Sequence, residues 1–520
     1  MPITASFNQE VFMKLYASID FFSEMCFAVW TPEMLDEYFK LMKSKGISRI
    51  YWIDQKEIIQ RSGFLPHDTR MRRTWANFNG DLTRAAAEIA HKNGLEIFVI
   101  IKPYESSIQQ NAVSDENIDS PGVDVVGGRQ RLCTDFARQH PEVMIKRQTW
   151  PLPGQKAVKF VVNFSEPLKE EGVFKVFGSD TNSGYELISE RKAVPGTVNI
   201  EVPVSKWKFM VFTLEGCSGG NCYRKIVSAL DADGREVPFS LSVLSNQRYQ
   251  DVAYHLDIWK RTNNGGFCQY GMIFDYAPGV PSNIFTPEEV ENNATFDFAD
   301  AREHALGVTL ELNPAIRGCP DPENQTFRNF LNDWVKEVLD HGYDGVEIRV
   351  TNHNSPVFWR EYGTGREIRL ARGNAHTSLL RELSAIVRGA GKKFGLHIAN
   401  CMFGSSPEKS TPMEFFWDYH TWLEEKLCDE VTHKLLMSDG FSPDSLKLLE
   451  ICRAKNIPVN YCRMLHGIPD PADYAGQIAK IGVDAFNIYE SGTVWTRSAE
   501  GIFVETKPEQ AASLWQIPKI

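Results

Sequence analysis

Short apolar runs alternate with amphipathic segments of helical period along most of this chain. Three such strand–helix units are expected before residue 150 and five more after residue 324. The expected strands cover residues 25–30, 48–54, 95–104, 344–350, 393–400, 428–436, 458–464 and 484–490. Eight alternating units predict an α/β fold, a (β/α)8 TIM barrel with parallel strands. An open doubly wound sheet is the alternative, but no glycine-rich phosphate loop follows any of these runs.

The alternation stops after the third expected strand. From residue 150 to 254, short alternating segments such as 158–164 and 207–216 are separated by Gly, Pro, Asn and Asp. This pattern predicts an inserted β-sandwich, and its Asp-Ala-Asp-Gly turn at 231–234 is similar to turns of carbohydrate-binding modules. Residues 1–149 would then form the first part of the barrel. Residues 255–520 would form a loop-rich segment, with one more strand at 307–312, and the remainder of the barrel.

Composition narrows the classes of partner. The formal net charge over 520 residues is -11, and Lys and Arg are dispersed, so neither nucleic acid nor a membrane surface is an expected partner. No apolar run is long enough to span a membrane, and the first residues do not resemble a signal peptide. The chain is therefore expected to be cytoplasmic, although a periplasmic or secreted protein whose signal peptide had been removed would look the same. Cys217 and Cys222 could form a local disulfide or remain two free thiols.

One expected strand carries charge on the face that should point into the barrel. In the run 344–353, Val346, Ile348 and Val350 share one face, so Glu347 and Arg349 share the other. Burying a carboxylate and a guanidinium is unfavourable by several kcal/mol unless they pair or face a wet cavity. The strand therefore indicates either a ligand pocket or a structural ion pair.

Polar and aromatic residues gather where the other expected strands end. In barrel enzymes the chemistry lies at the carboxyl ends of the strands. The candidate binding residues there are Trp52, Asp54, Lys102, Tyr104, Arg349, His397, Asn400, Lys434, Asn460, Arg463, Tyr489 and Trp495, and the candidate catalytic residues are Glu347, His353 and Glu490. Carboxylates for acid and base chemistry, with polar and aromatic groups for sugar rings, are typical of a glycosidase. His397 fits a satisfied core histidine equally well, and strict alternation places Glu490 on the outer face unless the strand end twists.

At these residues the chain resembles the glycosylhydrolase-like barrels related to glycoside hydrolase family ten. The resemblance rests on the strand beginning at Asp344, on the segment 136–142, and on the segment 416–422 leading to 429–431. It covers nearly the whole barrel and leaves the β insert unexplained. It implies an inward site carboxylate at Glu347. This chain carries Arg349 where such barrels often have a second carboxylate, so the partner of Glu347 is expected on another strand.

The sequence therefore predicts a glycoside hydrolase that acts on a poly- or oligosaccharide without a metal or other cofactor. Glu347 and Glu490 would be the catalytic carboxyls and His353 a supporting group. Arg349 suits a uronate, sialate or sulfated sugar, or it serves only to neutralise Glu347.

Two other functions stay open. One is a non-catalytic carbohydrate-binding protein on a degenerate barrel. The other is a lyase or epimerase of sugar acids, with His353 or Lys102 as the base and a metal held by Asp54, Glu347 and His397.

Overall fold

A computed structural model describes residues 13–21, 29–54, 73–104, 124–125, 128–129, 136, 139–146, 156–164, 166–180, 186–216, 221–222, 227–237, 239–245, 268–276, 296–297, 304–310, 315–349, 366–399, 416–434, 442–465, 468–497 and 501–517. Of the residues singled out above, Cys217, Val350, His353 and Asn400 lie outside this set.

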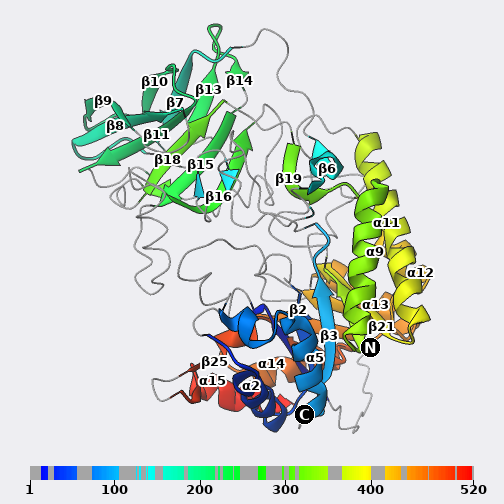
Figure 1. Cartoon of the computed structure of the whole chain (residues 1–520). Coiled ribbons are helices and arrows are strands. Elements are labelled where there is room, and N and C mark those ends of the chain that lie inside the picture. Colours follow the sequence, from blue (N-terminus) through cyan, green and yellow to red (C-terminus); the bar gives the residue numbers. More distant parts are fainter. Residues whose placement is uncertain are drawn as a thin grey trace, which may run out of the picture.

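Eight parallel strands close into a barrel in the order β1-β2-β3-β20-β21-β22-β23-β24 (Figure 1). They are β1 (Lys14–Ile19), β2 (Ile47–Ile53), β3 (Glu96–Ile101), β20 (Gly345–Ile348), β21 (Lys393–Ala399), β22 (Glu430–Lys434), β23 (Val459–Arg463) and β24 (Ala485–Ile488). The predicted (β/α)8 barrel is therefore confirmed. The chain leaves it after β3 and returns at β20, as expected.

The first predicted strand is wrong. The barrel begins with β1 at Lys14–Ile19, and residues 29 and 30 are not in a strand. Trp30 instead lies fully buried between Phe21 and Tyr38, with ring centroids 5.5 and 5.8 Å away. Trp30 therefore belongs to the packing around the helices and not to a barrel strand. The true strand is less apolar because one of its faces points into a partly polar barrel interior.

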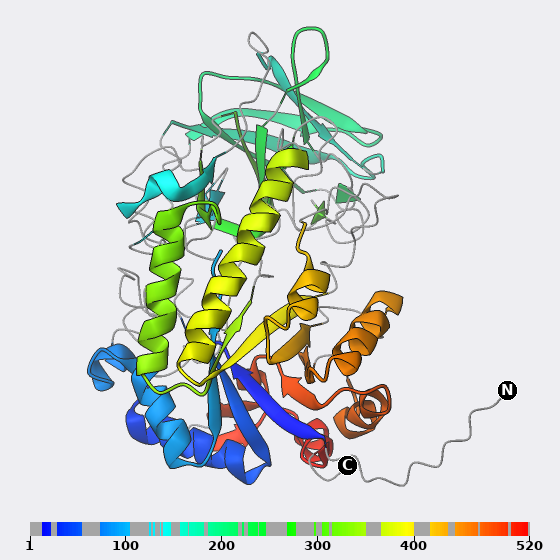
Figure 2. The same cartoon turned by 90° about the vertical axis from the view of Figure 1, so that its right-hand side faces the viewer.

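Helices follow the strands and cover the barrel. They are α2 (Pro32–Ser44), α5 (Leu82–Lys92), α9 (Gln325–Asp340), α11 (Arg366–Gly389), α12 (Tyr419–Glu424), α13 (Pro443–Ala454), α14 (Pro471–Lys480) and α15 (Pro508–Leu514). Side chains of Thr31, Asp81, Asn324, Ser442 and Asp470 cap their amino termini, which explains where these helices start. Figure 2 shows α9 and α11 side by side, and Arg328 of α9 forms an ion pair with Glu382 of α11.

The insert contains two antiparallel sheets. The four-stranded sheet has the order β10 (Asn199–Pro203), β7 (Lys159–Asn163), β13 (Val227–Leu230) and β14 (Glu236–Val237). The six-stranded sheet has the order β16 (Cys268–Tyr276), β15 (Phe239–Ser245), β18 (His304–Thr309), β11 (Phe209–Glu215), β8 (Gly172–Ser179) and β9 (Glu186–Ala193). Phe160 of the first sheet packs against Phe212 and Phe239 of the second, with ring centroids 6.0 and 5.8 Å apart. The insert is therefore a sandwich with a core of its own.

The sandwich draws strands from beyond residue 254. β18 lies between β15 and β11 in the six-stranded sheet, and β16 forms its edge. In Figure 1 both sheets lie above the barrel, on the side to which β3 points. The other short strands are β4 (Asp124–Val125), β5 (Gly128–Arg129), β6 (Met144–Lys146), β12 (Asn221–Cys222), β17 (Phe296–Asp297), β19 (Ala315–Pro320), β25 (Trp495–Arg497) and β26 (Phe503–Glu505).

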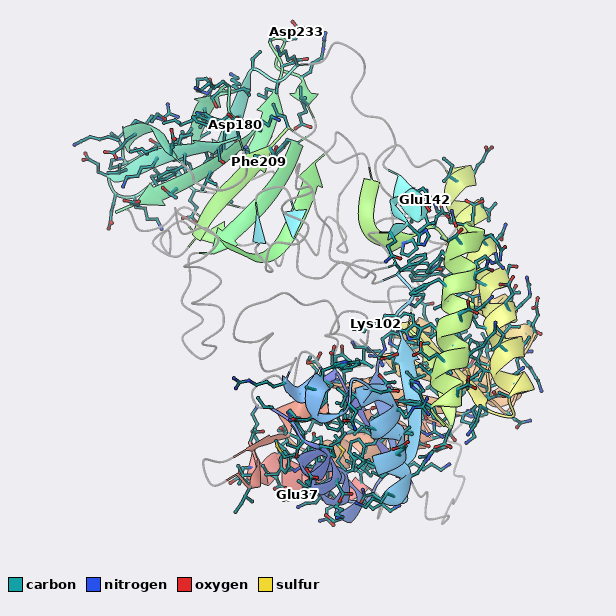
Figure 3. All side chains as sticks on the ribbon, viewed as in Figure 1. Glu37, Lys102, Glu142, Asp180, Phe209 and Asp233 are labelled. Carbon is teal, nitrogen blue, oxygen red and sulfur yellow. The ribbon has the colours of Figure 1, made fainter. Side chains whose placement is uncertain are left out.

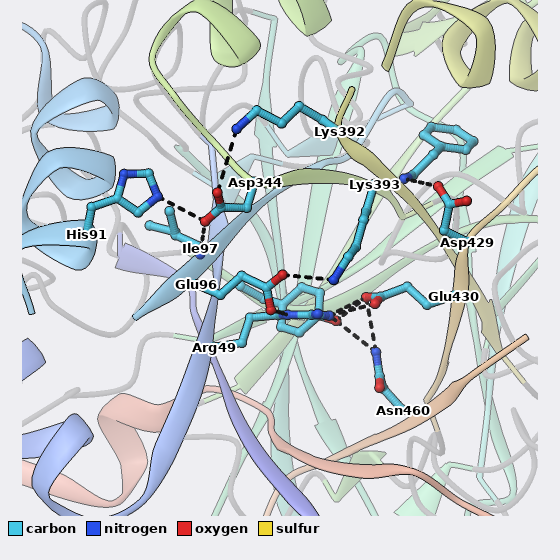
Figure 4. A network of polar contacts seen from close by, with 12 residues as sticks. Arg49, His91, Glu96, Ile97, Asp344, Lys392, Lys393, Asp429, Glu430 and Asn460 are labelled. Carbon is cyan, nitrogen blue, oxygen red and sulfur yellow. Dashed lines mark hydrogen bonds and ion pairs between the residues drawn. The ribbon is translucent and has the colours of Figure 1, made fainter. Parts of the chain in front are cut away.

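A polar network fills the amino-terminal part of the barrel interior (Figure 4). Arg49 of β2 donates from Nη1 to both carboxylate oxygens of Glu430 on β22, at 2.6 and 2.7 Å, and from Nε to Glu96 on β3 at 2.7 Å. Its guanidinium carbon lies 4.5 Å from the ring centroid of Tyr16 and 4.0 Å from that of Phe98. The buried charge is thus paired with carboxylates and covered by aromatic rings.

Two interior glycines allow a direct test of this packing. A Cβ added to Gly345 would lie 2.5 Å from the Phe98 ring and 2.8 Å from the carbonyl oxygen of Lys393, whereas one added to Gly395 would meet nothing closer than 3.6 Å. We expect Gly345→Ala to lower the free energy of unfolding by about 1–3 kcal/mol, because neither the ring nor the backbone can retreat in a packed barrel. Gly395→Ala is the matched control in denaturant unfolding. Equal stability of the two variants would contradict the described packing.

The independence of the sandwich remains a prediction. Because its core does not depend on the barrel core, limited proteolysis should release a protected fragment that includes β7 to β18. Deleting this fragment should leave a folded barrel with an altered range of substrates. Cleavage that spreads through the sandwich strands as fast as through the linking segments would show that the insert cannot fold alone.

Candidate active site

Six of the sequence-predicted site residues converge inside the barrel, toward the carboxyl ends of its strands. They are Lys102, Glu347, Arg349, His397, Lys434 and Tyr489, from or directly after β3, β20, β21, β22 and β24. Figure 3 places Lys102 at the end of β3 on the side of the insert. Strand alternation turns all six inward, and their contacts and mutual electrostatic effects tie them into one group.

Glu347 and Arg349 form a buried ion pair. Arg349 Nη2 donates to Glu347 Oε1 at 3.1 Å, and the hydroxyl of Thr432 donates to Glu347 Oε2. Both side chains are buried, with exposed fractions of 0% for Glu347 and 1% for Arg349. Burial raises the pKa of Glu347, and the nearby guanidinium works against that rise. Glu347 therefore lies beneath Arg349, with a bonding partner on each of its oxygens.

Lys434 is a buried amine at the end of β22. Its Nζ lies 3.3 Å from the ring centroid of Tyr489, a cation–π contact. Burial, and then the charges of Arg349 and Lys102, lower the pKa of Lys434 to about 7, although Glu490 opposes them. The site thus contains an amine whose charge depends on pH near neutrality.

His397 lies among these cations and is fully buried. Burial lowers its pKa well below the ordinary value, and the charges of Arg349 and Lys434 lower it further. His397 is therefore a neutral imidazole at physiological pH. It can orient a substrate or exchange hydrogen bonds, but it does not add charge to the site.

Glu490 reaches the site through an unusual backbone conformation. Alternation along β24 would place it on the outer face, but its φ of 54° is left-handed, which non-glycine residues rarely adopt. This twist brings its carboxyl within electrostatic reach of Asp20, Lys434 and Lys102. Burial, and then the charge of Asp20, raise the pKa of Glu490. Backbone strain of about 1–3 kcal/mol at a partly buried carboxyl is typical of functional sites.

Asp20 is a site residue that the sequence analysis missed. It directly follows β1, is 5% exposed, and its Oδ2 lies 3.7 Å from Nζ of Lys102. Alternation along β1 turns Tyr16, Ser18 and Asp20 to the same side. Asp20 is the polar residue at the carboxyl end of the strand Lys14–Ile19. Because the sequence analysis placed the first strand at residues 25–30, it did not consider Asp20.

Six other candidates do not join this group. The amide of Asn460 donates to Tyr51 and Glu430, in the network around Arg49. The carboxylate of Asp54 accepts hydrogen bonds from Thr83 of α5 and Trp334 of α9, on the helix side of β2. The remaining four belong to the helix side as well: Trp52 packs against Phe21, Tyr104 bonds to His376, Arg463 donates to Tyr474, and Trp495 stacks on Trp515. Alternation explains Trp52 and Arg463, which share strand faces with buried apolar residues.

The position of Asp54 concerns the alternative of a metal-dependent lyase or epimerase. Asp54 is held by the helix layer, whereas Glu347 and His397 point into the barrel, so the three expected metal ligands do not meet. Within the described residues, no cluster of three or more His, Cys, Asp or Glu side chains suits a metal ion. In the same part of the chain, no helix is both long and apolar enough to cross a membrane.

The buried amine generates a pH-dependent prediction. Lys434 takes up a proton less readily in the folded chain than in the unfolded one, so it destabilises the fold most below pH 7, and this effect is lost as the pH rises toward 10.5. Lys434→Met should therefore increase the free energy of unfolding at pH 6 by about 2–3 kcal/mol more than at pH 9. Denaturant unfolding of both proteins at the two pH values measures this difference.

Lys447→Met is the control, because Lys447 lies exposed on α13 in contact with solvent. Its effect on stability should be small and equal at both pH values. A Lys434→Met effect that is likewise independent of pH would show that the amine does not titrate in this range.

Comparison with known proteins gives no family assignment. No protein-family model matches the sequence, and no curated protein matches it. Among solved structures, the glycoside hydrolase domain of PelA from Pseudomonas aeruginosa is 15% identical with a TM-score of 0.23, covering 33% of this chain and 63% of that domain. The catalytic domain of β-amylase from Paenibacillus polymyxa is 11% identical with a TM-score of 0.37, covering 98% and 99%. Trehalose-6-phosphate hydrolase from Bacillus licheniformis is 10% identical with a TM-score of 0.33, covering 94% and 66%. Likenesses this weak carry no argument about function.

Proposed function

We propose that this protein is a glycoside hydrolase in which Glu490 is the proton donor. The observation that carries the proposal is the left-handed backbone at Glu490, which sets a carboxyl of raised pKa at the carboxyl end of the barrel. A general acid for glycoside cleavage must hold its proton more tightly than a free carboxyl does, and burial beside another carboxylate acts in this direction.

Asp20 is the second carboxyl of the proposal. Its charge contributes to the raised pKa of Glu490, and the ammonium of Lys102 lies 3.7 Å from its Oδ2. Cleavage of a glycosidic bond uses two carboxyls in different electrostatic environments, because one donates a proton while the other attacks the sugar or activates water. Asp20 would act as the nucleophile or as the base that activates water.

Glu347, expected from the sequence to be a catalytic carboxyl, takes a positioning role in this proposal. Thr432 and Arg349 occupy its two oxygens, and its side chain has no exposed surface. Such a carboxylate is well suited to hold the guanidinium of Arg349 in place. His353, outside the described residues, keeps the supporting role expected from the sequence.

The proposed substrate is a poly- or oligosaccharide that contains an acidic sugar. Three cationic side chains from or directly after different strands lie close together in the barrel interior: Lys102, Arg349 and Lys434. Burial lowers the pKa of Lys434 most, and repulsion from the neighbouring cations lowers it further. An anionic group of the substrate would offset this repulsion.

A screen for released reducing ends on natural glycans and aryl glycosides tests the proposal. Glu490→Gln and Asp20→Asn should each lower turnover of natural glycans by a factor of about a hundred or more. Because an activated dinitrophenyl leaving group needs no proton, Glu490→Gln should lose much less activity on that aglycone, whereas Asp20→Asn should lose activity on both.

Glu33→Gln, an exposed carboxyl on α2, is the matched control and should retain full activity. Glycan binding without cleavage across the screen would favour the non-catalytic carbohydrate-binding alternative. Full activity in Glu490→Gln would remove that residue from the mechanism.

A further inference from the structure

The guanidinium of Arg349 has more hydrogen-bonding capacity than its ion pair uses. Only Nη2 donates to Glu347, while Nε and Nη1 have no hydrogen-bond partner among the described residues. The side chain is 1% exposed. If Arg349 only neutralised Glu347, these donors would stay buried without hydrogen bonds. Each such donor has lost its bonds to water, which is unfavourable in free energy.

Asn487 on β24 has the same property. Its exposed fraction is 0%, and neither its amide nitrogen nor its amide oxygen has a partner within the described part of the chain. A buried amide with both groups unsatisfied is rare in folded proteins, because each group loses its bonds to water. Asn487 lies in strand register with Tyr16 of β1 and Cys462 of β23.

These two side chains share one region of the barrel interior. The guanidinium carbon of Arg349 lies 5.4 Å from the ring centroid of Tyr489, which follows Asn487 by two residues on the same strand face. Cys462, the register neighbour of Asn487, also lies within the electrostatic reach of Arg349 and Lys434. Strands β20 and β24 stand on opposite sides of the eight-stranded barrel, so the two groups approach the interior from facing walls.

We propose that Arg349 and Asn487 form a binding subsite for the acidic group of a sugar, a carboxylate or a sulfate ester. The free guanidinium donors would bind the oxyanion, and the amide of Asn487 would bond to the same group or to the adjacent hydroxyl. Lys434 and Lys102 supply further positive charge, and the ring of Tyr489 gives the sugar an apolar surface. This inference rests on the proposed function for the class of ligand, but the subsite does not require that the ligand be cleaved.

Calorimetric titration of the Glu490→Gln variant tests the subsite without turnover. The probes are glucuronate and galacturonate against glucose and galactose, with galactose 6-sulfate as a further probe. We expect the acidic sugars to bind at least about tenfold more tightly than their neutral counterparts, the order expected from a hydrogen bond to a charged group. Tighter uronate binding identifies a carboxylate as the ligand, and tighter sulfate-ester binding identifies a sulfated sugar. Equal affinity for acidic and neutral sugars would overturn the subsite.

Asn487→Leu separates a ligand contact from a structural role. The variant loses no hydrogen bond within the described residues, so the free energy of unfolding should be unchanged or higher while affinity for the acidic sugar falls about tenfold or more. Thr213→Val in β11 is the matched control, because its hydroxyl is also buried without a hydrogen-bond partner there but belongs to the sandwich. Unchanged affinity in Asn487→Leu would exclude this residue from the subsite.

Removing Arg349 alone would leave Glu347 buried without its cation, so the double variant Glu347→Gln with Arg349→Met is used instead. It should bind acidic and neutral sugars equally.

The hydrolase proposal and the subsite proposal can fail separately. Tight binding of acidic sugars with no cleavage of any glycan would contradict the hydrolase and keep the subsite. Cleavage of neutral glycans with no preference for acidic sugars would support the hydrolase and contradict the subsite.

Discussion

The contact between Arg49 and Glu430 spans the barrel interior, and the polar groups above it depend on it. Nη1 of Arg49 donates to both oxygens of Glu430, and Asn460 and Tyr51 complete the set of partners. A buried ion pair of this kind adds little net stability, because desolvation offsets most of the attraction. It does discriminate between strand registers, since a shift of one residue in β2 or β22 would leave two charges buried and unpaired.

The same constraint reaches the candidate site. Burial raises the pKa of Glu347, the charge of Glu430 adds to this rise, and Glu347 in turn accepts a hydrogen bond from Arg349. Charged layers therefore follow one another along the barrel axis, from the floor at Arg49 to the carboxyl ends at Lys434 and Glu490. A barrel filled only with apolar side chains would avoid the desolvation cost of these charges.

Most of the fold could be predicted from the sequence because it depends on local periodicity and on helix start signals. Strands such as β21 and β23 are short apolar runs bounded by helices, and caps such as Ser442 mark where the helices begin. β1 could not be found in this way, because half of its residues face a polar interior and a more apolar run lies close by. The strands β16 and β18 of the sandwich pair with partners distant in sequence, which local patterns do not reveal.

The candidate site was predictable only where strict alternation holds. Glu347, Arg349 and Lys434 follow the two-residue period and were found, and the same period placed Trp52 and Arg463 on the opposite face once the strands were known. Glu490 breaks the two-residue period because its backbone is left-handed. The local sequence does not predict this conformation. Asp20 was not predicted because the strand before it, β1, was not predicted. Contacts across the barrel, such as that between Arg349 and the ring of Tyr489, require the three-dimensional arrangement.

The position of the sandwich also shapes how the barrel can close. β3 and β20 pair side by side, yet about 240 residues separate them along the chain. The entropy lost in closing so long a loop grows only with the logarithm of its length, so the final stability is little affected, but the search for this contact is slow. A sandwich that folds first on its own core would remove the residues from β7 to β18 from the flexible part of this loop and so shorten it. The order of assembly, insert before barrel closure, would then be encoded in the place at which the barrel is interrupted.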